Sequence, residues 1–140
     1  WLEEGFHRAG RGKGFSDFEI QPRAEIIITD DVKGALAKQK PRVALYAGGM
    51  GHRDKNFHKE MMIRRGFGDA AQRIQELYLA KRKDEAVAAV PDEFCDEMSL
   101  VGPVARIKDR YRAWADSGIT GLTIVADQRE AMELMADLAR

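Results

Sequence analysis

The feature that most constrains this chain is a helix, a tight turn and a buried strand that follow one another near the C-terminus. Pro103 stands at the first position of the helix, where its missing backbone N–H costs no hydrogen bond. Apolar residues recur at helical spacing after it, and Gly118 can end the helix in a left-handed conformation. The continuous apolar run 122–126 is typical of a parallel strand covered on both faces. This unit predicts an α/β fold, with residues 99–103 as the loop that leads into the helix.

A second strand is predicted much earlier in the chain, at residues 24–29, which are rich in β-branched side chains. Asp30 and Asp31 end this strand and can cap a helix that begins near Val32. Several helices follow before the closing unit. Two adjacent parallel strands with helices before, between and after them are a slice of an alternating β/α fold.

The chain is too short to close such a fold. A two-stranded sheet leaves unpaired backbone groups at its edges, and a complete TIM barrel needs about 250 residues. The 140 residues also begin at Trp1, in what reads as the last turns of a helix. We therefore expect one partial domain, residues 1–140, that forms the C-terminal portion of a (β/α)8 barrel. A helical block at about 43–98 is expected to be inserted between the last two strands.

The charge balance and the composition of the chain limit the classes of partner that it is expected to bind. The chain has 23 basic and 23 acidic side chains, whereas proteins that bind nucleic acid or anionic membranes usually carry a basic excess. The single cysteine, Cys95, rules out an intramolecular disulfide and suits a reducing cytoplasm. No apolar run approaches the roughly 20 residues that span a bilayer. We expect a cytoplasmic protein that binds neither nucleic acid nor membrane.

Several segments of the chain, in their order along it, match the sequence pattern of a known protein family. They are residues 1–6, 29–32, 44–51, 56–57, 74–79, 88–93 and 99–103. Together they resemble the C-terminal part of the luciferase-like monooxygenase family, in its coenzyme F420-dependent oxidoreductase branch. None of these segments is catalytic in itself, but the similarity covers nearly the whole chain.

The resemblance implies a (β/α)8 barrel that binds a flavin or deazaflavin at the C-terminal ends of its strands. It implies hydride transfer between coenzyme F420 and a small organic substrate. The groups that lie against the ring in this family come mostly from early and middle strands, so this chain alone is expected to be inactive. Its partners would be a small-molecule substrate, the remainder of its own barrel and further subunits of a homo-oligomer.

Two alternatives stay open. Within the family, the protein could be a flavin mononucleotide (FMN) monooxygenase that uses molecular oxygen. Outside it, the chain could be a stand-alone helical interaction module without catalysis. Residues 26–28, three isoleucines in a row, argue against the module because a solvent-facing sheet would alternate polar and apolar side chains.

The glycine-rich segment 48–51 is the first candidate for a binding site. Glycines allow the backbone to approach a phosphate or a ring closely. Because the segment follows an expected helix rather than a strand, it is not a dinucleotide-binding fingerprint. It is either a plain loop between helices or part of a substrate pocket.

Polar residues just beyond it form the second candidate. His52, Arg53, Lys55, Asn56 and His58 would suit an anionic substrate or the acidic tail of the deazaflavin, or could simply be a solvated helix start. The histidines lack metal-ligand spacing, so no metal site is expected. The substrate-pocket candidates are then Tyr46, Gly48, Gly49, Met50, Arg53, Asn56 and His58.

No catalytic or cofactor-binding residue is assigned by the sequence. Asp30 and Asp31 follow a strand where barrel active sites lie, although a helix cap explains them more simply. The acidic neighbours of Cys95 are expected to raise the pKa of its thiol, which argues against a nucleophile. Arg64 and Arg65 either stabilise a helix C-terminus or bind an anion, and the first explanation is the simpler one. Tyr111 and Trp114 are expected to pack in the core.

Overall fold

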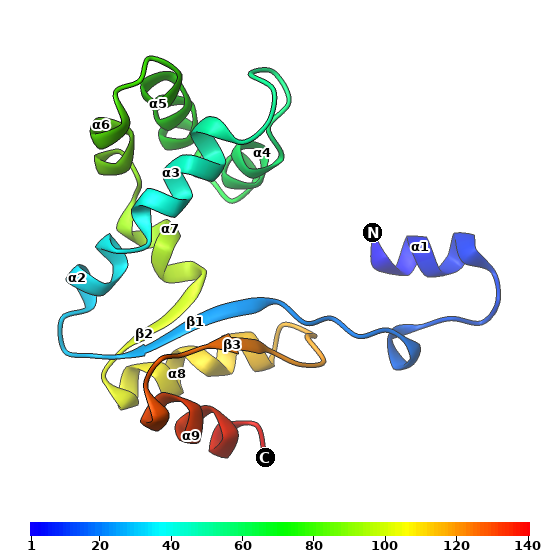
Figure 1. The fold of residues 1–140 in the computed structure, drawn as a ribbon. Helices are drawn as coiled ribbons and strands as arrows, with labels where there is room; N and C mark the ends of the chain where they lie inside the picture. Colours follow the sequence, from blue (N-terminus) through cyan, green and yellow to red (C-terminus); the bar gives the residue numbers. More distant parts are fainter.

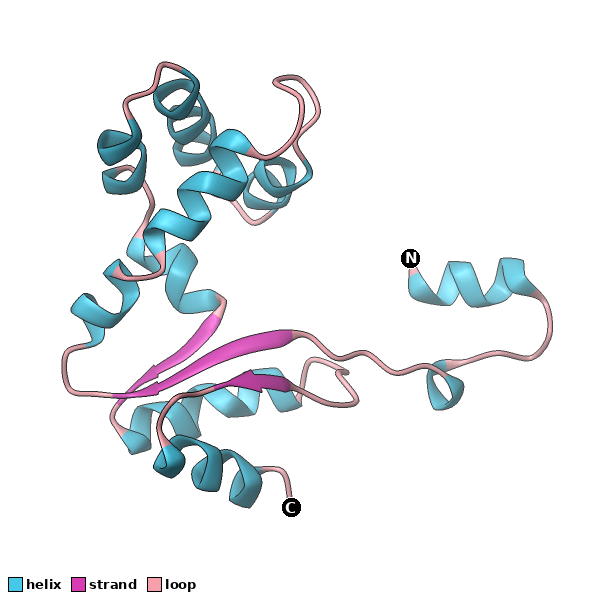
Figure 2. Ribbon diagram, viewed as in Figure 1, coloured by secondary structure: helices cyan, strands magenta, loops and turns pink.

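The computed structural model describes residues 1–140 and contains a three-stranded parallel sheet with helices on both faces (Figures 1 and 2). The strands are β1 (Arg23–Ile28), β2 (Ser99–Gly102) and β3 (Thr123–Val125). Their order in the sheet is β2-β1-β3, so β1 is the central strand and pairs in parallel with both neighbours. The expected parallel pairing of the first and last strands is confirmed, in a register that places Ala24 opposite Ile124.

One face of the sheet is covered by the two C-terminal helices, α8 (Val104–Ala115) and α9 (Arg129–Leu138) (Figure 1). Alternate β1 residues point to this face, because successive side chains of a strand face opposite sides. Ala24 and Ile26 are buried here with Ile107 of α8 and with Met135 of α9. Tyr111 and Trp114 pack against the same cluster, which confirms their expected packing role.

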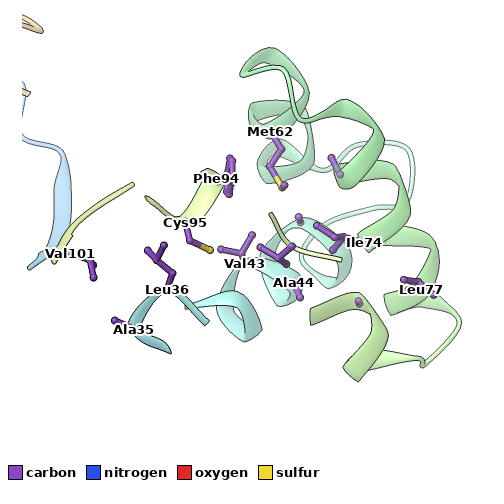
Figure 3. Close-up of a cluster of buried hydrophobic side chains, with 14 residues drawn as sticks. Ala35, Leu36, Val43, Ala44, Met62, Ile74, Leu77, Phe94, Cys95 and Val101 are labelled. Carbon is purple, nitrogen blue, oxygen red and sulfur yellow. The ribbon is translucent and has the colours of Figure 1, made fainter. Parts of the chain in front are cut away.

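The opposite face carries a block of six helices between β1 and β2 (Figure 2). They are α2 (Val32–Ala37), α3 (Lys40–Gly49), α4 (Phe57–Arg64), α5 (Gly68–Leu79), α6 (Lys83–Ala88) and α7 (Asp92–Glu97). Figure 3 shows their shared core, in which Val43, Ile74 and Phe94 come from three different helices. Ile27 of β1 and Val101 of β2 join this core from the sheet, so the block and the sheet are one packed unit.

Most of the N-terminal segment lies away from this body (Figure 1), but the Arg64 guanidinium of α4 lies over the Trp1 ring, 5.7 Å from its centroid. Helix α1 (Leu2–Ala9) has no buried residue and ends at Gly10, whose φ is 63°. The Phe6 ring packs edge-on against Phe15 at 5.2 Å and Phe18 at 5.4 Å between ring centroids. The segment is held together by its own aromatic side chains rather than by the sheet.

The prediction of a loop at residues 99–103 was wrong. Residues 99–102 form β2, and each of them is buried. A strand of four residues with a polar first residue and a terminal glycine gives little periodicity, but Ser99 satisfies its hydroxyl by donating to the Cys95 carbonyl oxygen at 2.9 Å. The helical block therefore lies between β1 and β2, not between the last two strands.

The prediction of a loop at residues 48–51 was also wrong for the first two of these residues. Gly48 and Gly49 are the last residues of α3, and only Met50 and Gly51 lie beyond the helix. The Tyr78 side chain of α5 leaves no room for a Cβ atom at either glycine. An added Cβ at Gly48 would lie 2.5 Å from Tyr78 Cβ, and one at Gly49 would lie 2.4 Å from Tyr78 Cε1. They allow α3 and α5 to pack closely.

The expected helix boundaries mostly hold. Asp31 caps α2 by accepting a hydrogen bond from the Gly34 backbone N–H at 2.9 Å. Gly66 and Gly118 have φ of 88° and 82°, the left-handed values expected after a helix. Helix α5 ends at Leu79, and Lys81, with a φ of 63°, separates it from α6. None of the helices combines the length and the apolar character that a membrane span requires.

Candidate functional site

A pocket of about 230 Å³ opens between the first half of β1 and helices α3, α4 and α7. We call it the β1–α3 pocket. It lies on the sheet face opposite α8 and α9. Its lining consists of Arg23, Glu25, Arg42, Val43, Tyr46, Ala47, His58, Met61, Met62, Phe94 and Met98.

Helical spacing brings the lining together. Arg42, Val43, Tyr46 and Ala47 lie at positions i, i+1, i+4 and i+5 of α3, so they share one face of that helix. The same spacing in α4 places His58 one turn before Met61 and Met62. The pocket is therefore built on regular elements rather than on loops.

The floor of the pocket is apolar. Met62 and Phe94 are each 1% exposed, and Val43 and Ala47 are buried beside them (Figure 3 shows Val43, Met62 and Phe94). Met61 and Met98 complete the apolar part from α4 and the end of α7. Such a floor favours the apolar body of a ligand.

The charged groups gather on the sheet side. Arg23 and Glu25 stand two residues apart on β1 and so point to the same face. The Arg42 guanidinium Nη2 lies 3.7 Å from Glu25 Oε2, which is an ion pair but longer than a hydrogen bond. Arg23 forms no ion pair. The lining thus holds two guanidinium groups against one carboxylate.

Two aromatic side chains stand together in the lining. The Tyr46 and His58 rings are tilted against each other with 4.7 Å between centroids. Neither the Tyr46 hydroxyl nor the His58 imidazole makes a hydrogen bond within the chain. Both can therefore bind a polar atom of a ligand.

Of the seven pocket residues expected from the sequence, only Tyr46 and His58 line this pocket. Gly48 and Gly49 pack on Tyr78, as described above. Met50 lies beyond the end of α3 and is exposed. These three are not brought to the pocket.

Asn56 holds two helices together. Its side-chain Nδ2 donates to the carbonyl oxygens of Tyr46 at 3.0 Å and Ala47 at 2.9 Å, while its Oδ1 accepts from the Lys59 N–H at 3.0 Å. The residue is buried and caps α4. Asn56 fixes the end of α3 and the start of α4, and so positions Tyr46 and His58.

Arg53 lines a separate polar depression over α4 and α5, together with Lys59, Gln72 and Gln75. Its carbonyl oxygen accepts a hydrogen bond from Gln75 Nε2 at 3.0 Å. The Lys59 ammonium group donates to both glutamine side chains, at 2.5 Å and 2.7 Å. Arg53 is thus not part of the β1–α3 pocket.

The remaining candidate residues lie outside the β1–α3 pocket. Asp31 is the cap of α2, and Asp30 is exposed beside it. Cys95 is buried, and its burial raises the pKa of the thiol from 9.0 to about 11. The direction matches the expectation, but desolvation is the main cause and Asp92 and Asp96 contribute less. No group of three or more His, Cys, Asp or Glu side chains is placed to hold a metal ion.

Sequence reasoning missed the charged side of the pocket. The signal was present in the first four residues of β1, where Arg23 and Glu25 alternate with Ala24 and Ile26. Alternation marks a strand with one polar face, and the run of three isoleucines at 26–28 concealed it. Arg42, Phe94 and the methionines gave no local signal, because only the packing of α3, α4 and α7 brings them together.

The pocket does not fit a whole deazaflavin or flavin cofactor. Ligand pockets usually measure roughly 300–1,000 Å³, and this one is smaller at about 230 Å³. Its lining also lacks a glycine-rich turn that could hold phosphate groups, since Gly48 and Gly49 are helical. The residues fit a small molecule with an apolar body and a polar group.

Comparison with known proteins identifies the family of the chain. The family described as luciferase-like monooxygenase matches residues 2–121. Over 138 residues the chain is 37% identical to a Mycobacterium tuberculosis protein named "putative coenzyme F420-dependent oxidoreductase". That alignment covers 99% of this chain and 40% of the relative, so the chain spans less than half of the relative's length. The chain belongs to the luciferase-like monooxygenase family.

Proposed function

We propose that the chain forms part of an oxidoreductase that transfers a hydride between coenzyme F420 and a small organic substrate. The β1–α3 pocket would form one wall of the substrate site. The observation that supports this most is the pocket itself, which joins a buried apolar floor to unpaired polar groups. The name of the Mycobacterium tuberculosis relative supports the choice of cofactor.

In this proposal, this chain binds the substrate, and residues outside the chain bind most of the cofactor. The pocket is too small for the cofactor, so the cofactor would be bound mainly by other parts of a (β/α)8 barrel. The outer edges of β2 and β3 are unpaired and could continue into further strands. The order β2-β1-β3 differs from the sequential strand order of a (β/α)8 barrel, because β3 lies beside β1 and not beside β2.

The chain's own residues would bind and orient the substrate. Its apolar body would lie on Val43, Met62 and Phe94. The Tyr46 hydroxyl and the His58 imidazole would hydrogen-bond the oxygen of a carbonyl or hydroxyl group. We further propose that the complete protein is cytoplasmic and assembles as a homo-oligomer.

A second candidate is an FMN-dependent monooxygenase. The family description favours it, because that description names monooxygenases rather than deazaflavin enzymes. The two candidates differ in the cofactor and not in the use of the β1–α3 pocket.

The test is a fluorescence titration of the protein encoded by the complete reading frame with F420 and, separately, with FMN. The 140-residue chain alone is titrated in parallel. We expect saturable F420 binding by the complete protein, at least tenfold tighter than FMN binding, and no saturable binding by the chain alone.

Other results would change the account in defined ways. Tighter binding of FMN would replace the proposal with the monooxygenase. No binding of either cofactor by the complete protein would contradict both enzyme functions and favour an interaction module. Tight F420 binding by the chain alone would contradict the proposal that residues outside this chain bind most of the cofactor.

A further inference from the structure

We infer that the β1–α3 pocket selects small apolar molecules that carry one anionic group, of which a carboxylate is the simplest. The inference rests on the proposed function in one respect: it takes this pocket to be where the substrate binds. It adds the substrate class, which follows from the charges and the volume of the pocket.

The charge balance of the lining is positive. Arg23 and Arg42 contribute two positive charges and Glu25 one negative charge, and the pocket contains no other carboxylate. Arg23 has no ion-pair partner anywhere in the chain. Arg23 is exposed, so an anionic group on the ligand can pair with its guanidinium, whereas a cationic group would be repelled by it.

The one ion pair in the pocket is loose. Arg42 Nη2 and Glu25 Oε2 are 3.7 Å apart, and the two side chains are 47% and 33% exposed. A guanidinium group has five N–H donors, so Arg42 can keep this contact and still donate to a second carboxylate. Arg42 is therefore available to an anionic group of a ligand as well as to Glu25.

The rest of the lining sets the body of the ligand. Met61, Met62, Met98 and Phe94 form the apolar side. Unbranched thioether side chains adapt to different shapes, so the floor favours flexible or irregular apolar groups over one fixed shape. A volume of about 230 Å³ lies below the roughly 300–1,000 Å³ of pockets for drug-sized ligands, which suits a ligand of roughly ten non-hydrogen atoms.

The experiment uses three probes that share an eight-carbon chain and differ in charge: octanoate, 1-octanol and octylammonium. Each is titrated by calorimetry into the protein encoded by the complete reading frame, without cofactor. We expect octanoate to bind roughly tenfold or more tighter than octanol, because charge-assisted hydrogen bonds form only with the carboxylate. Octylammonium should bind most weakly.

Single substitutions assign the preference to this pocket. Arg23→Gln and Arg42→Gln should each weaken octanoate binding about tenfold and leave octanol binding unchanged. Glu25→Gln should strengthen octanoate binding, because it removes the competing carboxylate. This opposite sign cannot arise from general damage to the fold. Arg112→Gln is the matched control, since Arg112 is exposed on α8 and outside the pocket.

Equal binding of octanoate and octanol, or a preference that all three pocket variants retain, would overturn the inference. Its failure can be told apart from failure of the proposed function. A protein that binds F420 but shows no preference for octanoate contradicts only the substrate class. A protein that prefers octanoate but binds neither cofactor contradicts only the proposed function.

Discussion

Gly48 shows, at the scale of one residue, how a glycine that suggests a binding loop can serve packing instead. It lies inside α3, where an added methyl group would meet Tyr78 Cβ at 2.5 Å and the Ile74 carbonyl oxygen at 3.2 Å. Neither of these is the end of a flexible side chain. The contact between α3 and α5 therefore excludes a side chain at this position.

Gly48→Ala should lower the free energy of unfolding by about 1–2 kcal/mol, because overpacking costs more than the gain in helix propensity returns. The matched control is Gly5→Ala in α1, where no atom lies within 4 Å of the added Cβ. The control should be neutral or slightly stabilising. Urea denaturation measures both. Equal effects of the two substitutions would contradict the packing role.

Cys95 gives the chain a pH dependence above neutrality. Burial raises the pKa of the thiol to about 11 from an ordinary value of 9.0, so the folded chain favours the protonated form. The resulting stabilisation is complete below pH 9 and is lost as the pH rises from 9 toward 11.

We therefore expect wild type to lose about 2–3 kcal/mol of stability over this interval relative to Cys95→Ala. The comparison with Cys95→Ala is necessary because lysines and tyrosines titrate in the same range. Denaturation at pH 7, 9 and 11 measures the difference between the two proteins. A constant difference would show that the thiol pKa is not raised.

At the scale of elements, an ion cluster joins α7, β2 and α8. The Asp96 Oδ2 accepts from Arg106 Nη2 at 2.7 Å and lies 3.1 Å from Arg110 Nη1. Arg106 also donates to the Val101 carbonyl oxygen of β2, and Arg110 Nη2 donates to the Asp96 carbonyl oxygen at 2.7 Å. The Asp96 side chain is only 18% exposed. The cluster fixes where the helical block returns to the sheet.

Asp96→Ala should destabilise the chain by about 2–3 kcal/mol, since it leaves two guanidinium groups without their partly buried partner. Asp109→Ala is the control, because the Asp109–Arg112 pair is 3.9 Å long and both side chains are 80% exposed. The control should change stability by no more than about 0.5 kcal/mol. If both substitutions had the same small effect, the cluster would not hold α7 to α8.

The elements also show what the sequence could and could not predict. Helices that have a cap and a clear periodicity, such as α2 with Asp31 and α8 with Pro103 and Gly118, were predicted because the signals are local. β2 was missed because it is short and its burial depends on partners in β1 and α7. Of the eleven residues that line the pocket, only Tyr46 and His58 were among the sequence candidates. These two are near in sequence, whereas Arg23 and Phe94 reach the pocket only through the fold.

At the scale of the whole molecule, the sheet and its helices form a unit with open sides. β1 is paired on both edges, but β2 and β3 each have one unpaired edge. The chain matches 40% of the length of its Mycobacterium tuberculosis relative. A pocket that is too small for the cofactor agrees with the proposal that this chain supplies part of an active site.

The central claim is that the β1–α3 pocket receives the substrate, and the most direct test is to fill it. Met98→Trp enlarges a partly exposed lining residue into the pocket, and Leu79→Trp is the control at an exposed position outside it. The rate of oxidation of reduced F420 is measured in the complete protein with a panel of aldehydes, ketones and enones of roughly ten non-hydrogen atoms, with and without a carboxylate.

We expect the wild type and Leu79→Trp to react with at least one member of the panel. Met98→Trp should react at least tenfold more slowly while its affinity for F420 stays the same. If Met98→Trp reacts as fast as wild type with every active member of the panel, the substrate does not bind in this pocket.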